Sequence, residues 1–378
     1  MSDQISIGLA NMHKEADEVR AFLPDFVSDL ENSGAKIYLE YDYGGGMSFT
    51  QEDYASVAPG VTFTSLQEIF QQDYVLVLRY PDDEAINWMR PGGCLISMVH
   101  YPTRPGRVAL FQERNIVSIS LDTITDDSGK RMIENLRSVG WNGVNTAFKA
   151  LSNTYPDPGF FNSERLPIQV TLLGAGAVGI HVVQAAIQYG DPDFRSRMVS
   201  DGVPGVKVTV VDYDITPHKT LMSDILKSTD ILVDATQRLD ASQPVIPNSW
   251  VAYLPKHAII TDLAVDPYTL ETDPPVVRGI EGIPQGNLDK YIFPPDDPDW
   301  GQTIPRSIPS NHRRTTVSCY SWPGILPKEC MDHYGDQLKP FMRVLLKVGY
   351  KNLNPQGTFH ERALYRASLK GWLESHPG

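Results

Sequence analysis

The sequence has few cysteines and no long apolar run. Its three cysteines, Cys94, Cys319 and Cys330, lack metal-ligand spacing and are too few for a disulfide scaffold, so we expect buried thiols and no metal site. No apolar stretch approaches the roughly 18 residues of a membrane span. The first residues also lack the basic and then apolar run of a signal peptide. We therefore expect a soluble, cytoplasmic protein.

Basic residues are scarce relative to acidic ones. The 33 Lys and Arg against 46 Asp and Glu give a formal net charge of −13, and no basic stripe offsets it. Such a balance disfavours nucleic acid and anionic membranes, so we expect neither as a partner. The chain has 378 residues. Because single cores stop growing at about 250 to 300 residues, this length predicts two domains.

A glycine motif lies near the middle of the chain. The segment 172–179, with the sequence LLGAGAVG, contains Gly-x-Gly-x-x-Gly at the end of an apolar, strand-like run. Val178, Val182 and Ala186 then recur at helical spacing. A strand-to-helix turn of this kind brings backbone and a helix amino end close to a pyrophosphate. The motif predicts a dinucleotide site, and a plain packing turn is the alternative.

The next strand supports this interpretation. Residues 206–211 alternate and are followed by Asp212, whose carboxylate would accept hydrogen bonds from the ribose hydroxyls and repel a 2′-phosphate. This favours NAD over NADP. Gly179 and Asp212 are 33 positions apart, which exceeds the usual gap of about 20, and we interpret 191–205, rich in Pro, Gly and Asp, as a surface insertion. The predicted cofactor-binding residues are Gly174, Gly176, Ala177, Val178, Gly179 and Asp212.

Strand-like and helical segments alternate in both halves of the chain. In the first half, strands are expected at 5–10, 36–41, 74–80, 94–100 and 116–120, with a helix face from Val19 to Leu30. In the second half they are expected at 168–173, 206–212, 231–236, 258–263 and 315–320. Such alternation predicts an α/β fold with parallel sheets.

The segments between these runs set the expected boundaries. Residues 130–151 predict a connecting helix, 272–314 a long ordered excursion without helical periodicity, and the chain after Pro327 a helical end. We expect two Rossmann-like lobes with a cleft between them and carboxyl-terminal helices that return to the first lobe. The expected domains are 1–133 with 325–378 for the substrate, and 134–324 for NAD.

Four charged or titratable residues lie at positions where an α/β protein with a dinucleotide site could bind or transform a substrate. His100 and Arg79 follow neighbouring strands of the first half, and ligands gather at the carboxyl ends of parallel strands. An imidazole can exchange a proton near neutral pH, and an arginine can bind a carboxylate in bidentate fashion. Arg20 lies in the expected first helix region, and Asp266 follows the strand 258–263. Each residue alone is more typical of structure than of function.

Together these positions resemble the family of alanine dehydrogenase, which includes the transhydrogenase dinucleotide-binding subunit, lysine-forming saccharopine dehydrogenase and carboxyethylornithine synthase. The resemblance covers nearly the whole chain, and its matching segments keep their order and spacing. Those segments are EVRAFLP at 18–24, GGMSFTQEDY at 45–54, LISMVH at 95–100, LLGAGAVG at 172–179, TDLAVD at 261–266 and SWPGILP at 321–327.

The resemblance implies a role for each residue. Arg20 would bind the substrate carboxylate, His100 would act as acid or base, and Asp266 would sit near the nicotinamide. Arg79 stands where the family has a substrate-site lysine. Arginine keeps the charge but cannot lose a proton, so Arg79 would orient a carboxylate without serving as a base. Ser321, in place of the usual Asn, and the 272–314 excursion are further departures, and they put alanine itself in doubt as the substrate.

The sequence therefore predicts an NAD-dependent oxidoreductase that interconverts an amino or imino acid with a 2-oxo acid. A dehydrogenase of the opine or saccharopine type, which joins a 2-oxo acid to an amino acid, is the first alternative. A non-catalytic NAD-binding protein is the second. The expected partner is a small amino acid or 2-oxo acid. The family resemblance also allows a homo-oligomer, although no segment identifies an interface.

Overall fold

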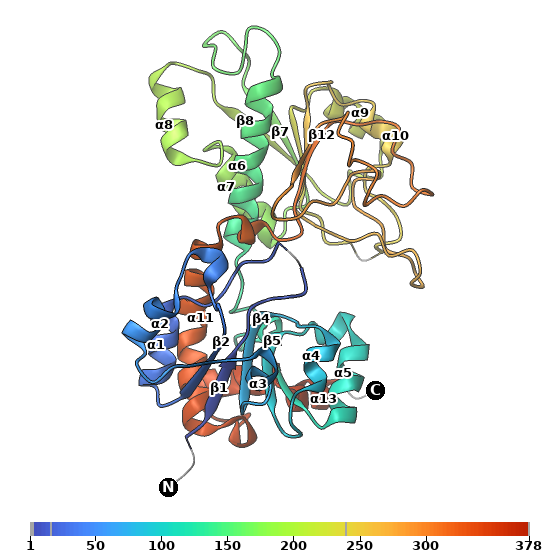
Figure 1. The fold of residues 1–378 in the computed structure, drawn as a ribbon. Helices are drawn as coiled ribbons and strands as arrows, with labels where there is room; N and C mark the ends of the chain where they lie inside the picture. Colours follow the sequence, from blue (N-terminus) through green and yellow to red (C-terminus); the bar gives the residue numbers. More distant parts are fainter. Residues whose placement is uncertain (1–3, 16, 239, 377–378) are drawn as a thin grey trace. The chain divides into compact units, whose positions relative to one another are not determined.

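The computed structural model describes residues 4–15, 17–238 and 240–376, which form two compact units. One unit runs to Asn135 and resumes at Leu326, and the other spans Leu136–Ile325 (Figure 1). Each unit has its own sheet, helices and hydrophobic core. The predicted α/β class with two sheets made mainly of parallel strands is confirmed.

The first unit is built on a six-stranded parallel sheet in the order β3-β2-β1-β4-β5-β6. The strand order reverses between β1 and β4, and in open sheets of this kind ligands bind outside the carboxyl ends of the strands at such a point. The strands are β1 (Ser6–Leu9), β2 (Lys36–Glu40), β3 (Thr62–Thr64), β4 (Tyr74–Arg79), β5 (Cys94–Met98) and β6 (Val117–Ser120). Strands β2 and β5 end one and two residues earlier than the ranges 36–41 and 94–100 that the sequence predicts.

Helices cover this sheet on both sides, and the carboxyl-terminal part of the chain supplies several of them (Figure 1). The long helix α11 packs on α1 and α12, and α13 packs on β6. The helices of this unit are α1 (Pro24–Asn32), α2 (Gln51–Val57), α3 (Leu66–Ile69), α4 (Asp83–Asn87), α5 (Pro105–Arg114), α11 (Pro327–Val348), α12 (Phe359–Ala367) and α13 (Leu369–Ser375). The end of the chain thus returns to the first unit.

Arg20 does not belong to the first helix, and that expectation is wrong. Helix α1 begins at Pro24, which lacks a backbone N–H and suits the first helical turn. The residues from Val19 to Leu23 precede it without regular secondary structure, and Leu23 is extended. Arg20 is buried in this preceding segment, with only 3% of its surface exposed.

The second unit contains a six-stranded sheet in the order β11-β12-β10-β9-β7-β8. Only the short edge strand β11 runs antiparallel to its neighbour among the strands that the structure describes. The strand order reverses at β7, which is flanked by β8 and β9. The strands are β7 (Ile168–Leu173), β8 (Val206–Val211), β9 (Ile231–Asp234), β10 (Ile259–Asp262), β11 (Ile292–Phe293) and β12 (Thr315–Ser318).

One expectation for the helices of this unit is wrong, and one expected insertion contains a helix that was not predicted from the sequence. The connecting helix begins at Leu136 instead of Lys130, because backbone bonds of Lys130 and Met132 to Asp126 and Ile124 hold that segment as a turn. The expected surface insertion 191–205 contains a helix, α8, that the Asp191 side chain caps. The helices are α6 (Leu136–Thr154), α7 (Ala177–Ala186), α8 (Pro192–Ser200), α9 (Lys219–Lys227) and α10 (Asn248–Val251).

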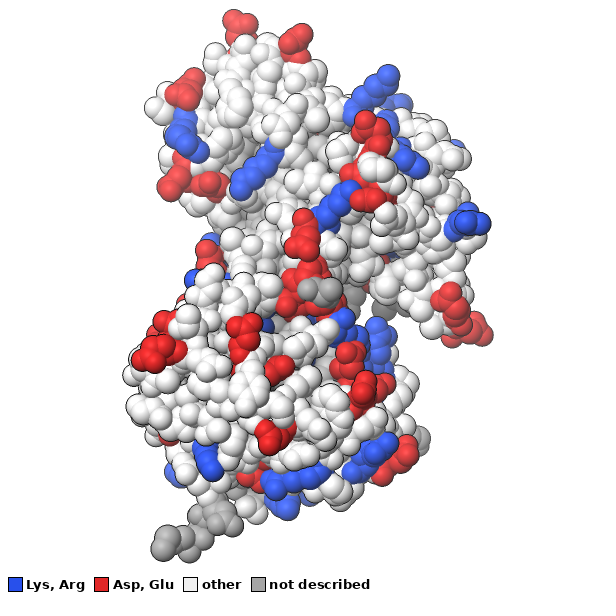
Figure 2. Space-filling view, in the orientation of Figure 1, with Lys and Arg blue, Asp and Glu red and all other residues white. Residues whose placement is uncertain are grey.

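The expected excursion and the expected buried thiols are both present in the structure. The excursion 272–314 contributes only β11 in regular structure among its residues, and all three cysteines are buried thiols outside any disulfide. Acidic and basic side chains are interspersed over the face drawn in Figure 2. Among the described residues, no helix has the length and apolarity of a membrane span, and no three His, Cys, Asp or Glu side chains are grouped to hold a metal ion.

Candidate functional site

The glycine motif forms the turn from β7 into α7. Gly174 has a φ of +86°, and a Cβ there would lie 2.9 Å from the carbonyl oxygen of Ala235. A Cβ on Gly179 would lie 2.4 Å from the carbonyl oxygen of Gly174. A side chain is therefore excluded at Gly174 by the backbone conformation and by close approach of the chain, and at Gly179 by close approach alone. Ala177, Val178 and Gly179 form the first turn of α7.

A hollow of about 530 Å³ opens in front of this turn. Gly174, Gly176 and Asp212 all line it, although Asp212 comes from the end of β8. One oxygen of Asp212 accepts a hydrogen bond from the backbone N–H of Tyr213, 2.8 Å away, and the side chain is exposed. A Cβ on Gly176 would meet nothing within 4 Å, so the space in front of the helix amino end is open. The structure thus brings the predicted loop and carboxylate to one hollow.

Asp266 lies on a strained loop beyond β10. The preceding Val265 has a φ of +57°, which a β-branched residue rarely adopts, and its N–H donates to Oδ1 of Asp262 at 3.0 Å. The Asp266 carboxylate forms an ion pair with Arg238, with 2.7 Å between Oδ2 and Nη2. Arg238 itself lines the hollow that contains Asp212. Backbone strain of this kind concentrates at functional sites.

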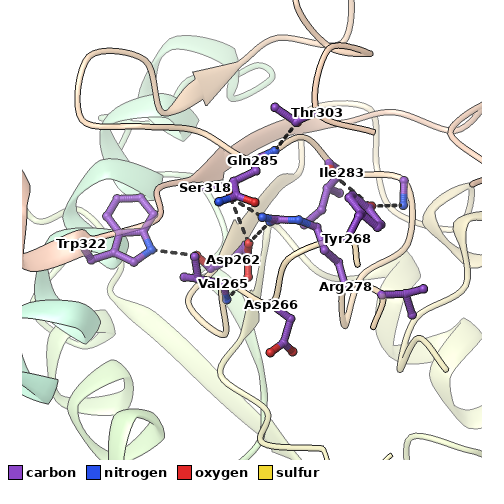
Figure 3. Close-up of polar contacts among 12 residues, drawn as sticks. Asp262, Val265, Asp266, Tyr268, Arg278, Ile283, Gln285, Thr303, Ser318 and Trp322 are labelled. Carbon is purple, nitrogen blue, oxygen red and sulfur yellow. Dashed lines mark hydrogen bonds and ion pairs between the residues drawn. The ribbon is translucent and has the colours of Figure 1, made fainter. Parts of the chain in front are cut away.

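A buried polar network lies beneath this loop, at the carboxyl ends of β9, β10 and β12 (Figure 3). Asp262 accepts hydrogen bonds from the Ser318 hydroxyl and the Arg278 guanidinium, and its carbonyl accepts from the Trp322 indole. Arg278 comes from the 272–314 excursion, so the ion pair fastens that segment to the sheet. Neighbouring Asp234 is fully buried. Burial and the Asp262 carboxylate raise the pKa of Asp234 to about 6.

In the first unit, His100 follows β5 with a left-handed backbone, at a φ of 60°. Its Nδ1 lies 3.3 Å from Oδ2 of Asp122, and its backbone N–H donates to Oδ1 of the same carboxylate at 3.1 Å. Burial alone would raise the pKa of Asp122, but hydrogen bonds and charge from His100, with a hydrogen bond from Ser120, bring it down to about 2. The imidazole stays half exposed and is oriented by a carboxylate, as acid–base chemistry requires.

The two predicted carboxylate-binding arginines already have acidic partners. Arg20 is buried against Glu18, with its Nε donating to Oε1 at 2.8 Å. Burial alone would lower the pKa of Arg20, but the hydrogen bond and charge of Glu18 raise it above its usual range. Arg79 is 2.9 Å from Glu15 and 3.9 Å from Glu18. Binding of a substrate carboxylate by Arg20 or Arg79 therefore remains a prediction. A substrate would have to share these arginines with Glu15 and Glu18.

Arg79 borders one of two hollows at this edge of the first sheet. The hollow it borders has a volume of about 210 Å³ and also includes Lys14 and Trp88. The second hollow, of about 380 Å³, is lined by Lys14, Arg104 and Arg107. Both hollows lie where the chain leaves β1 and β4, the strands at which the order reverses. Cationic side chains therefore line the place where a ligand is expected, together with carboxylates such as those of Asp82 and Asp83.

Several residues of these arrangements were not predicted. They are the acidic partners Glu15, Glu18 and Asp122, the cation Arg238, and the buried Asp234, Asp262 and Arg278. Asp122 comes two residues after the strand beside His100, so its position at a strand end was a usable signal. Glu18 is only two residues from Arg20. The remaining contacts join segments that are further apart in the sequence, which composition and periodicity do not reveal.

Comparison with known proteins agrees with this architecture. Residues 12–139 match the family model of the alanine dehydrogenase/PNT N-terminal domain. The chain is 21% identical over 282 residues to alanine dehydrogenase of Bacillus subtilis, which covers 69% of this chain and 70% of that enzyme. This chain is similar to alanine dehydrogenases over about two thirds of its length. The predicted family resemblance is thereby confirmed.

Transhydrogenase is a second relative of this alanine dehydrogenase-like chain. The alpha subunit of the NAD(P) transhydrogenase of Haemophilus influenzae is 24% identical over 188 residues, or 49% of this chain, and the match spans only 36% of that subunit. The fold is similar to a solved L-alanine dehydrogenase, with a TM-score of 0.71, 16% identity and coverage of 96% and 94% of the two chains. A transhydrogenase from Sinorhizobium meliloti follows at 0.60, with 14% identity and coverage of 95% and 96%.

Proposed function

We propose that this protein is an NAD-dependent dehydrogenase that interconverts an amino or imino acid with a 2-oxo acid. The observation that carries the proposal is the hollow of the second unit, where the glycine turn and Asp212 face one space. The family of relatives supports the amino-acid class of substrate, because alanine dehydrogenases match about two thirds of the chain.

The residues of this hollow fit a nicotinamide dinucleotide. The backbone at Gly174 and Gly176 and the amino end of α7 would bind the pyrophosphate, since helix amino ends attract anions. The open space at Gly176 leaves room for that approach. Asp212 would accept hydrogen bonds from the ribose hydroxyls and would repel a 2′-phosphate, which favours NAD over NADP. The bound cofactor supplies the hydride acceptor and donor of the reaction.

In the first unit, His100 would move the proton that accompanies hydride transfer. Asp122 would hold the imidazole in one orientation and stabilise its protonated form. Arg79 would bind the substrate carboxylate through its planar guanidinium, and Arg20 would supply a second positive charge. In the second unit, Asp266 would lie near the nicotinamide and balance positive charge that develops on the imino intermediate. Pre-set charges of this kind supply much of an enzyme's acceleration.

One observation favours a second candidate, a dehydrogenase that joins a 2-oxo acid to the amino group of an amino acid. This reaction needs anchors for two carboxylates. The hollow lined by Lys14, Arg104 and Arg107 offers three further cations beside the hollow that Arg79 borders, although Asp82 and Asp83 also line it. The two candidates share the cofactor and His100 but differ in the nitrogen donor.

The test is to incubate the protein with NADH, a series of 2-oxo acids and either ammonia or individual amino acids, and to follow NADH oxidation. Turnover with ammonia supports the first candidate, and turnover that requires an amino acid supports the second. Tight NADH binding without turnover in any combination overturns both and favours a non-catalytic NAD-binding protein. Replacing NADH by NADPH should lower the rate, because Asp212 disfavours the additional phosphate.

A further inference from the structure

We infer that Arg238 is a positioning residue that holds Asp266 in place beside the cofactor hollow; this rests on the function proposed above. Arg238 follows β9 by four residues and lines the hollow that also contains the glycine turn and Asp212. Its side chain is only 7% exposed, whereas that of Asp266 is 33% exposed. The arginine is therefore part of the wall, and the carboxylate it holds remains accessible.

The contacts of Arg238 join three segments of the second unit. Its Nη2 pairs with Oδ2 of Asp266 at 2.7 Å and donates to the carbonyl of Val277. Its Nη1 donates to the carbonyl of Gln243 at 2.7 Å and to that of Ala241 at 3.4 Å. A planar guanidinium fixed by carbonyl oxygens on both nitrogens has little freedom to follow a moving carboxylate. Its ion pair with the fixed Arg238 guanidinium therefore restricts the position of the Asp266 carboxylate.

The backbone before Asp266 is constrained from the other side. Oδ1 of Asp262 accepts the N–H of Val265, and Asp262 is itself fixed by Ser318 and the guanidinium of Arg278 (Figure 3). The left-handed φ of Val265 is unfavourable for a β-branched residue, so the loop relaxes unless its contacts hold it. Arg238 supplies the side-chain contact at the end of this strained loop.

Through these contacts, Arg238 should affect the rate of the reaction. If Asp266 balances charge near the nicotinamide, its distance from the reacting atoms determines how much it stabilises the transition state. Arg238 acts through this placement and does not itself touch the reacting groups. Removing it should therefore lower kcat far more than it weakens the binding of NADH or substrate.

The experiment compares Arg238→Met, Arg238→Lys, Asp266→Ala and the Arg238→Met/Asp266→Ala double variant with the full-length wild type. Arg314→Met is the matched control, because Arg314 also donates to several carbonyl oxygens, those of Leu254 and Pro255 among them. Arg314 directly precedes β12, so it lies at the amino ends of the parallel strands, whereas Arg238 lies beyond their carboxyl ends. For each protein we would measure kcat, KM, the Kd for NADH by fluorescence, and thermal unfolding.

We expect Arg238→Met and Asp266→Ala each to lower kcat by about 100-fold, the size of effect that misplacement of one reacting group produces. The double variant should lose no more than the worse single variant, because both changes remove one function. Arg238→Lys should recover part of the rate by keeping a charge near Asp266. Arg314→Met should leave kcat unchanged.

Two results would overturn the inference while the proposed function stands. One is a wild-type protein that turns over, with an Arg238→Met variant whose kcat equals that of Arg314→Met. The other is a double variant whose losses multiply, since independent effects mean that Arg238 does not act through Asp266. A folded wild type that neither binds NADH nor turns over would instead overturn the proposed function, and this inference with it.

Discussion

The Nδ1 atom of His100 lies 3.3 Å from Oδ2 of Asp122, and both residues follow adjacent strands of the first sheet. The same carboxylate accepts the backbone N–H of His100, so it fixes the left-handed backbone as well as the ring. A carboxylate in this position selects one imidazole orientation and stabilises the protonated ring. The pair is the acid–base element on which the proposed chemistry depends.

Replacing His100 by Asn should lower kcat/KM by about 100- to 10,000-fold, because the acid–base group is lost. Asparagine is chosen because it tolerates a left-handed backbone better than alanine does. The control is His257→Asn, since His257 also pairs with a carboxylate, that of Asp230 at 2.8 Å, but at the amino edge of the second sheet. Steady-state rates of the two variants test whether His100 is the acid–base group. Equal rates would show that His100 takes no part in the mechanism.

Asp122→Asn should change the stability of the protein in acid. The pKa of Asp122 falls from an ordinary 3.8 to about 2 in the folded state, so the folded protein favours the ionised carboxylate. This contribution, about 2 kcal/mol, is present above about pH 4 and is lost as the pH falls toward 2. Urea unfolding of both proteins between pH 2 and about pH 6 measures it.

The stability difference between wild type and the Asp122→Asn variant should therefore shrink as the pH drops toward 2. Asp224→Asn is a suitable control, because Asp224 lies on the surface of α9 with 71% of its side chain exposed. A wild-type advantage that stays constant with pH would contradict the assignment.

Asp234→Asn should show the opposite pH dependence. Burial and the Asp262 carboxylate raise the pKa of Asp234 to about 6, so the folded state favours the protonated carboxyl. The resulting stabilisation is complete below about pH 4 and is lost as the pH rises through about 6, at up to about 1.4 kcal/mol per pH unit. Unfolding free energies from pH 4 to about pH 8 should therefore fall more in wild type than in Asp234→Asn, and parallel curves would refute this expectation.

Gly176→Ala should weaken NADH binding without destabilising the free protein. A Cβ at this position meets nothing within 4 Å, and the backbone has an ordinary negative φ. The added methyl group would occupy the space expected for the pyrophosphate, so the Kd for NADH should rise at least about tenfold, or about 1.4 kcal/mol. Gly205→Ala, at another open position, is the control. Equal affinities in a fluorescence titration would place the cofactor elsewhere.

The positions of the main strands in both units, but not their order in the sheets, could be predicted because buried parallel strands are short, continuous apolar runs. Tyr74–Arg79 and Ile168–Leu173 are examples, and each has at most two residues that are not fully buried. Boundaries were less predictable where side chains form local turns. The oxygen of Asp126 that accepts the N–H of Lys130 delays the start of α6 to Leu136, and no periodicity reveals such a bond.

The candidate site was predictable only in part, for a related reason. The glycine turn, Asp212, His100 and Asp266 follow strands or belong to a known motif, so their positions relative to a sheet edge can be inferred. Their partners come from other segments: the Arg238 ion pair spans 28 positions and the Asp122 contact spans 22. Such pairs depend on how the loops are placed over the sheet, which one sequence does not specify.

The central claim is that hydride passes between the nicotinamide and the α carbon of an amino acid. The most direct test supplies NADH carrying deuterium at the transferred position of C4, with a 2-oxo acid and ammonia or an amino acid, and analyses the product by mass spectrometry. We predict one deuterium at the α carbon of the new amino acid, and at least about 100-fold less of this product from the His100→Asn variant over the same time. Turnover that yields a product without deuterium, or no product with any substrate pair, would contradict the account.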